Sequence, residues 1–315
     1  MVDFKDIQAA SERLQNLIHR TPVLTSSQLS QWTGAELYLK CENLQRVGAF
    51  KFRGASNAVA QLTDEELVRG VCTHSSGNHA QALALAARQR DIPAYIIMPT
   101  SAPKVKRDAV LGYGATVIDC EPTLQARETT AAEAVRNYGA TFIHPYDHPH
   151  IIAGQGTAAL ELLQDHPQLD AIIAPIGGGG LMSGTAIAAH GLNPSIRVFG
   201  AEPCGADDAY RSFESGKLIP QTSPNTICDG LLTSLGDITW PIIQRHLEKV
   251  LTVDDQETIT AMRMVWTRTK TIIEPSCATP IAAIKRYGKE LGLEGKKVGV
   301  ILSGGNIDLD ALPWF

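Results

Sequence analysis

The chain has 315 residues, of which 44% are hydrophobic and 19% are charged, and its formal net charge is -5 at pH 7. A chain of this length buries a large core and is expected to split it into two lobes. The negative charge gives no general attraction to nucleic-acid phosphates or anionic lipids, which excludes nucleic acid and membrane surfaces as partners on electrostatic grounds. No apolar run reaches the length of a membrane span and the N-terminus lacks a signal-peptide segment, so we expect a cytoplasmic protein.

The six cysteines are scattered singly along the chain, at positions 41, 72, 120, 204, 228 and 277. Because no C-x-x-C pair occurs, their spacing indicates neither a zinc cluster nor a disulfide framework. We therefore expect reduced thiols, most of them buried.

The stretch "GAFKFRGA" at 48–55 places Lys51 among small and apolar residues, with Arg53 two positions later. Most lysines are solvated surface residues. A lysine in an apolar pocket can instead become nucleophilic and bond covalently to a carbonyl cofactor. The stretch alone does not decide between these two interpretations.

From about residue 70 to the C-terminus, short apolar runs alternate with helical patterns, and each run is typical of a strand buried on both faces of a parallel sheet. This order predicts an α/β fold in which helices cover parallel strands. Two prolines in "HPYDHPHIIAGQG" interrupt regular structure, so we place a lobe boundary near this stretch. The expected strand regions are 94–99, 115–120, 171–180, 197–203 and 297–306, and the helical stretches are 77–90, 129–139 and 154–166.

Ligands of an open parallel sheet bind beyond the carboxyl ends of the strands, which directs attention to the loops there. The loop "THSSGNHAQ" gathers hydrogen-bonding groups just before an alanine-rich helix. One serine could be only a helix N-cap, but two serines and an asparagine exceed what a cap requires. Free amides at a helix start, joined by hydroxyls, make a good receptor for a carboxylate. The polar residues of this loop are Thr73, Ser75, Ser76, Asn78 and His79, around Gly77.

The loop "PIGGGGLMSG" runs four glycines, Gly177–Gly180, between a predicted strand and a helix. Such a run indicates backbone that approaches a ligand closely, and successive amides at a helix start form a site for a phosphate. Neither a Walker motif nor a convincing G-x-G-x-x-G pattern is present, which disfavours nucleoside triphosphates and NAD. A tight turn without a ligand remains the alternative.

The last predicted strand ends in "ILSGGN", with Ser303 followed by two glycines. A hydroxyl at this place can hydrogen-bond a ring nitrogen without protonating it. Taken alone, Ser303 is more typical of a turn residue than of a ligand-binding residue.

The lysine, the polar loop, the glycine loop and the terminal serine occur in an order that resembles the fold-type II pyridoxal phosphate enzymes, in the branch of serine/threonine dehydratases and serine racemases. The similarity runs from "RTPV" at 20–23 to "SGGNIDL" at 303–309. It implies two open, twisted, mostly parallel sheets flanked by helices, with the cofactor between a large domain (1–69 and 148–315) and a small mobile domain (70–147). It also implies a homodimer that acts on a small amino acid.

The same resemblance implies roles for individual residues. Lys51 would hold pyridoxal 5'-phosphate and then act as a base, and Ser76 matches a serine that acts on the opposite face in racemases. Cofactor contacts would come from Lys51, Phe50, Asn78, Gly177, Gly178, Gly179, Gly180, Glu274 and Ser303. Substrate contacts would come from Ser75, Ser76, Gly77, Asn78, His79, Arg127, Tyr146 and Thr233.

A divalent cation site is also implied, in "AEPCGADDA". Glu202, Asp208 and the carbonyl of Ala206 match the family's site, and such oxygen ligands suit Mg²⁺ or Ca²⁺. The alternative is a solvated acidic loop.

A serine rather than an aspartate at the ring nitrogen favours expulsion of a β-hydroxyl over long-lived carbanion reactions. We therefore predict a dehydratase (ammonia-lyase) that converts L-serine or L-threonine to a 2-oxo acid and ammonia. Serine racemisation is the nearest alternative. The stretches "HPYDHPH" at 144–150 and "EPSCATP" at 274–280 depart from the racemase pattern. Cationic or donor groups in the first stretch could accept a distal carboxylate of the substrate. A 3-hydroxyaspartate dehydratase is therefore a further alternative. A non-catalytic binding protein and a Rossmann-type oxidoreductase are the remaining ones.

Overall fold

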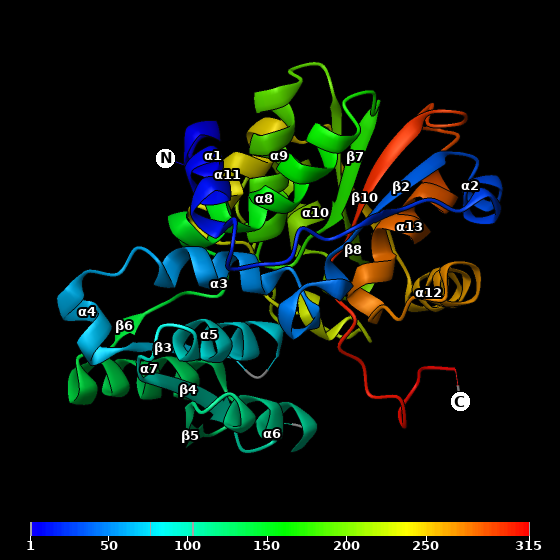
Figure 1. Cartoon of the computed structure of the whole chain (residues 1–315). Helices are drawn as coiled ribbons and strands as arrows, with labels where there is room; N and C mark the ends of the chain where they lie inside the picture. Colours follow the sequence, from blue (N-terminus) through cyan, green and yellow to red (C-terminus); the bar gives the residue numbers. More distant parts are fainter. Residues whose placement is uncertain (1, 76, 103, 315) are drawn as a thin grey trace.

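The computed structural model describes residues 2–75, 77–102 and 104–314, and within them the strands form two sheets (Figure 1). The six-stranded sheet has the order β1-β2-β10-β7-β8-β9, and the four-stranded sheet has the order β5-β4-β3-β6. β1 pairs with β2 in antiparallel fashion, and the other neighbouring strands are parallel. The strands are β1 (Val23–Leu24), β2 (Glu36–Cys41), β3 (Val71–His74), β4 (Ala94–Pro99), β5 (Thr116–Cys120), β6 (Thr141–Phe142), β7 (Ala171–Pro175), β8 (Arg197–Pro203), β9 (Lys249–Val253) and β10 (Lys297–Leu302).

Helices cover both sheets, which confirms the predicted α/β fold with two mostly parallel sheets. Among the described residues, no helix is long and apolar enough to cross a membrane. The α-helices are α1 (Phe4–Leu14), α2 (Ser27–Thr33), α3 (Lys51–Val59), α4 (Asp64–Arg69), α5 (Asn78–Arg88), α6 (Lys104–Gly112), α7 (Leu124–Tyr138), α8 (Pro149–Asp165), α9 (Gly180–Leu192), α10 (Asp208–Ser215), α11 (Thr239–His246), α12 (Asp255–Thr269) and α13 (Pro275–Tyr287). Short 3-10 helices are η1 (Glu42–Leu44), η2 (Arg46–Gly48), η3 (Cys204–Ala206) and η4 (Asp229–Leu231).

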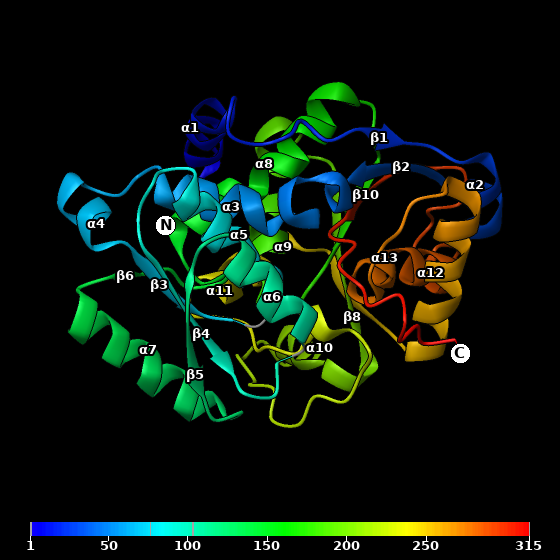
Figure 2. The same cartoon turned by 60° about the horizontal axis from the view of Figure 1, so that its bottom comes forward.

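The alternation of side chains along each strand builds one core on each face of the six-stranded sheet. On β7, Ile172 and Ala174 join the core under α1, α8, α9 and α11, whereas Ala171 and Ile173 join the core under α2, α12 and α13. Figure 2 shows these two helix groups on opposite sides of the sheet. The strands are therefore buried on both faces, as their continuously apolar sequence predicts.

Of the two prolines of "HPYDHPHIIAGQG", Pro145 lies in the irregular segment between β6 and α8 as expected, but Pro149 does not interrupt regular structure. Pro149 is instead the first residue of α8, and the side chain of His148 caps that helix by accepting a hydrogen bond from the His150 N–H at 3.2 Å. A proline at the first helical position loses no intrahelical hydrogen bond, so it begins a helix as readily as it ends one.

α3 packs between α5 and α8. Its apolar residues Phe52, Ala55 and Val59 join the core that packs α5 against β3 and β4. Its opposite face lies against α8, where Gly54 lacks a side chain and Arg53 is fully buried. The helix that begins with Lys51 is thus held from two sides.

Arg53 is the centre of a buried ion network. Its guanidinium donates to both carboxylate oxygens of Glu42, at 2.7 and 2.8 Å, and to both of Glu161, at 2.7 and 2.9 Å. Lys40 donates to Glu161 at 2.6 Å. Burial alone would raise the pKa of Glu161, but the hydrogen bonds and charge of Arg53, with the charge of Lys40, lower it overall. Two buried acids and two buried bases therefore neutralise one another beneath the start of α3.

We expect Arg53→Met to lower the free energy of unfolding by about 3–5 kcal/mol, because it leaves the Glu42 carboxylate buried without a hydrogen-bonded cation. Urea denaturation followed by circular dichroism measures this loss. Arg136→Met is the matched control, since Arg136 is 65% exposed and lies 4.0 Å from Glu133. Equal denaturation midpoints for the two variants would contradict the role assigned to the network.

Candidate active site

Lys51 lies at the first residue of α3, with its amine in a largely apolar environment. The amine donates to the carbonyl of Pro145 at 2.7 Å, and it lies 5.1 Å from the ring centroid of Phe50 and 6.0 Å from that of Tyr146. Burial lowers the pKa of Lys51 to about 8, and the charge of Glu274 opposes this shift. A substantial fraction of the amine is therefore neutral, and thus nucleophilic, near neutral pH.

The glycine loop at 177–180 connects β7 to α9 and has no room for side chains. A Cβ on Gly178 would collide with the ring of Tyr146, and one on Gly180 would lie 2.7 Å from Oε1 of Gln155. Gly179 has φ of +87°, which favours glycine. No side chain caps the start of α9 among the described residues, so its first N–H groups are available for an anion. This arrangement fits the phosphate of the expected cofactor.

Asn78, at the start of α5, is held in a polar cluster beside the amine. Its amide donates to both carboxylate oxygens of Glu274, at 3.0 and 3.1 Å, and accepts from the amide of Asn306 at 2.8 Å. Burial, followed by the charge of Asp229, raises the pKa of Glu274 to about 7. Asn306 was not among the residues predicted from the sequence, where its only signal is its position directly after "SGG".

Ser303 directly follows β10 and is buried. Its carbonyl accepts the N–H of Phe50 at 3.0 Å, and Ala49 forms a bridge with Gly304. The end of β10 therefore lies next to the residue that precedes Lys51. The structure thus places Ser303 beside Phe50 at the end of the six-stranded sheet, whereas Asn78 follows β3 of the four-stranded sheet and joins them through Glu274. The individual roles of these residues stay predictions.

The predicted substrate residues of the "SSGNH" loop have different surroundings. Ser76 lies outside the described residues, and the Ser75 hydroxyl accepts the Gly77 N–H at 3.4 Å. His79 is buried, with Nε2 at 3.3 Å from the carbonyl of Ile143 and Nδ1 without a hydrogen-bond partner among the described residues. Burial, and then the charge of Lys51, hold the pKa of His79 well below its ordinary value. His79 is therefore a neutral residue of the site wall.

"HPYDHPH" is largely a structural segment. Asp147 accepts the N–H groups of Ile238 and Thr239, at 2.9 and 3.1 Å, and so fixes the start of α11. His144 accepts the N–H of Asp147 at 2.8 Å through Nδ1. Burial, followed by the charge of His74, lowers the pKa of His144 to about 4. Extra cationic or donor groups were expected in this segment. His144 is a neutral hydrogen-bond donor there and not a cation.

Tyr146 remains the residue of this segment that faces the glycine loop. Burial raises the pKa of its phenol to about 12, and the adjoining hydroxyl of Thr233 opposes this shift. The phenol therefore keeps its proton at neutral pH. Thr233 itself is exposed.

Arg127 supplies a positive charge at the outer side of the site. Its Nε is buried and has no hydrogen-bond partner in the part of the chain that the structure describes, and its charge contributes to lowering the pKa of His74. The ring centroid of His74 lies 6.3 Å from that of His144, and the ring centroid of His144 lies 4.5 Å from that of Tyr146. The rings of His74, His144 and Tyr146 thus follow one another toward Lys51, whose amine lies 6.0 Å from the ring centroid of Tyr146.

The predicted cation ligands lie together at the end of β8. Glu202 and Asp208 are each 1% exposed, and Ala206 lies between them in η3. Glu202 accepts the N–H of Tyr210 at 2.5 Å, and Asp208 accepts that of Leu235 at 3.1 Å. Burial raises the pKa of both carboxyls. No third histidine, cysteine or acid completes a cluster among the described residues, so the donor set consists of two carboxylates and a carbonyl.

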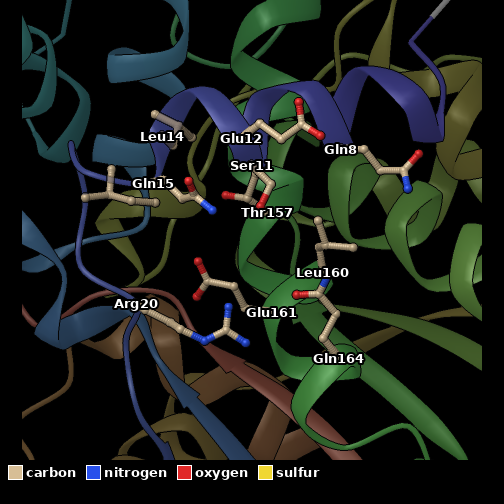
Figure 3. A pocket seen from close by; sticks show the side chains of 11 residues that line it. Gln8, Ser11, Glu12, Leu14, Gln15, Arg20, Thr157, Leu160, Glu161 and Gln164 are labelled. Carbon is tan, nitrogen blue, oxygen red and sulfur yellow. The ribbon is translucent and has the colours of Figure 1, made fainter.

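A separate cavity of about 440 Å³ lies between α1 and α8 (Figure 3). It is lined by Glu161 and Arg20, among others, and by none of the predicted site residues. Because Glu161 already holds Arg53 and Lys40, this cavity adjoins the ion network rather than the glycine loop.

Comparisons with known proteins agree with this geometry. The family described as "Pyridoxal-phosphate dependent enzyme" matches residues 14–304. The serine racemase of Dictyostelium discoideum is 52% identical over 313 residues, covering 99% of this chain and 97% of that protein. The beta-hydroxyaspartate dehydratase of Paracoccus denitrificans (strain Pd 1222) is 48% identical over 311 residues, covering 99% and 98%. The solved structure of a threonine deaminase from T.th. is similar with a TM-score of 0.92 at 40% identity, covering 98% and 99%.

We expect Lys51 of the cofactor-free protein to react half-maximally with acetic anhydride near pH 8, because burial lowers its pKa to about 8 and only the neutral amine reacts. Competitive labelling across neutral and alkaline pH, quantified by peptide mass spectrometry, measures this midpoint. The exposed Lys217 is the internal reference. A midpoint above about pH 10, the ordinary range of lysine, would contradict the assigned environment.

Proposed function

Because this chain belongs to the family of pyridoxal-phosphate-dependent enzymes, we propose that it is an ammonia-lyase that converts a small β-hydroxy amino acid to a 2-oxo acid and ammonia. The observation that carries this proposal is Lys51, whose amine donates to the carbonyl of Pro145 at 2.7 Å and has its pKa lowered to about 8 by burial. An amine that is partly neutral at working pH can both hold a carbonyl cofactor and accept a proton.

The described residues fit the cofactor. The N–H groups of Gly177–Gly180 would hold its phosphate, Asn78 its phenolic oxygen and Ser303 its ring nitrogen. When bound, pyridoxal phosphate withdraws electrons from the substrate's α-carbon, so that the α-proton becomes acidic and the β-hydroxyl can leave. The amine of Lys51 would take the α-proton. The phenol of Tyr146, which keeps its proton at neutral pH, would donate to a substrate oxygen.

Serine racemisation is the second candidate activity. It is supported by the 52% identity to a serine racemase, since Lys51 and Ser76 would then remove and return the α-proton on opposite faces. Elimination and racemisation share the removal of that proton, so one site can support both.

Among β-hydroxy amino acids, Arg127 favours one with a second carboxylate. Its Nε is buried and has no partner among the described residues, and its charge acts on His74. The 48% identity to a beta-hydroxyaspartate dehydratase also supports 3-hydroxyaspartate as a substrate, beside L-serine and L-threonine.

We expect the loaded enzyme to release 2-oxo acid and ammonia from 3-hydroxyaspartate and from L-serine, and Arg127→Met to change only the first reaction. Loss of a charge-assisted hydrogen bond to the distal carboxylate should raise KM for 3-hydroxyaspartate at least roughly tenfold and leave KM for L-serine within roughly twofold. Coupled assays of both products across L-serine, D-serine, L-threonine and the 3-hydroxyaspartate isomers measure this. Equal effects on both substrates would remove Arg127 from substrate recognition. No ammonia from any member of the panel would overturn the ammonia-lyase proposal.

A divalent cation at Glu202, Ala206 and Asp208 is a further part of the proposal. Two buried carboxylates that form no ion pair among the described residues, beside a backbone carbonyl, match the hard oxygen ligands that Mg²⁺ and Ca²⁺ prefer. The ion would stabilise the start of α10, where Asp208 accepts the N–H of Leu235.

We expect MgCl2 to raise the melting temperature by several degrees, because a ligand that binds only the folded protein stabilises it. Differential scanning fluorimetry with and without a chelator measures the shift. The variant Glu202→Gln should lose most of it, whereas Glu128→Gln, an exposed change, should keep it. A wild-type melting temperature indifferent to Mg²⁺, Ca²⁺ and chelator would contradict the site.

The resemblance also leads us to propose a cytoplasmic homodimer. The six cysteines of the chain are free thiols, and Cys204 is exposed. Free thiols support a reducing compartment. Light scattering coupled to size exclusion would give the oligomeric state.

A further inference from the structure

Gln155 is a buried polar side chain that the site described above does not use. It lies in α8 and is fully buried, yet neither its Oε1 nor its Nε2 has a hydrogen-bond partner among the described residues. A buried donor or acceptor left unpaired is costly, and few such groups occur in folded proteins. A partner outside the chain is therefore expected for this amide.

The amide lies between the lysine helix and the glycine loop. A Cβ on Gly54 would lie 3.2 Å from Nε2, and one on Gly180 would lie 2.7 Å from Oε1. Gly54 is one helical turn after Lys51, and Gly180 is the last glycine of the loop and the first residue of α9. The amide of Gln155 therefore adjoins the loop whose N–H groups fit a phosphate.

Close helix packing fixes the position of Gln155. On one side, a Cβ on Gly154 would lie 2.6 Å from the carbonyl of Arg53. On the other, a Cβ on Gly156 would lie 2.8 Å from the carbonyl of Gly184. Because α3 and α9 touch the backbone of α8 on both sides of Gln155, this residue cannot move its side chain far from the loop.

We propose that Gln155 is a positioning residue for the phosphate of the cofactor, with its amide nitrogen donating to a phosphate oxygen at the start of α9. The oxygen and nitrogen of a glutamine exchange places by a half-turn of the amide, so either can face Gly180. An amide donor adds a hydrogen bond to the phosphate without the charge of a lysine or arginine. This inference rests on the family's cofactor and is independent of which amino acid is the substrate.

The test compares two ligands that differ in the phosphate. Cofactor-free wild type and Gln155→Met are titrated with pyridoxal phosphate and with pyridoxal, and binding is followed by absorbance without turnover. We expect the variant to lose roughly 10- to 100-fold in affinity for pyridoxal phosphate, as for a hydrogen bond to a charged group, and less than about twofold for pyridoxal. Inorganic phosphate should also compete less well with pyridoxal phosphate for the variant.

Two further variants keep the test decisive. Gln155→Glu has nearly the same shape, and its carboxylate should repel the phosphate, so it should weaken pyridoxal phosphate more than Gln155→Met does. Gln164→Met changes an exposed glutamine of the same helix and should leave both affinities unchanged. An equal loss for both ligands, or unchanged binding of pyridoxal phosphate in the Met and Glu variants, would assign the amide to internal packing or to a buried water and overturn the proposal.

Discussion

The paired charges around Arg53 are the interaction on which the site depends. Lys51 is the first residue of α3, and Arg53 joins that first turn to η1 through Glu42 and to α8 through Glu161. A guanidinium with five donors can satisfy both carboxylates at once, whereas lysine could not. The position of the Lys51 amine relative to the glycine loop therefore follows from a network that contains no residue of the reaction itself.

A second constraint is the scarcity of fixed charge near the amine. His79 and His144 have lowered pKa values and Tyr146 a raised one, in each case first because of burial, so all three are neutral at pH 7. In the function proposed here, recognition of anionic groups would then fall to backbone N–H groups, to the Gln155 amide and to Arg127. The same burial that keeps the histidines neutral lowers the pKa of Lys51, so one environment both activates the amine and keeps these three side chains uncharged.

The sequence was most informative where local pattern determines structure. Gly177–Gly180 and Ser303 follow β7 and β10 of the six-stranded sheet, and Asn78 follows β3 of the four-stranded sheet. Because ligands bind beyond the carboxyl ends of parallel strands, these residues were found. Arg53 looked unremarkable because its partners lie 11 and 108 positions away. Asp147 was grouped with the substrate segment because its structural role, holding the start of α11, depends on a contact 91 positions away. Gln155 carried no local signal, since only the crossing of three helices buries its amide beside the glycine loop.

The most direct measurement for this account is the site of covalent attachment. The enzyme loaded with pyridoxal phosphate would be reduced with borohydride, digested and analysed by peptide mass spectrometry. The account predicts the phosphopyridoxyl group on Lys51, in the peptide at the start of α3. Attachment to another lysine, or none in a protein that binds the cofactor, would contradict it.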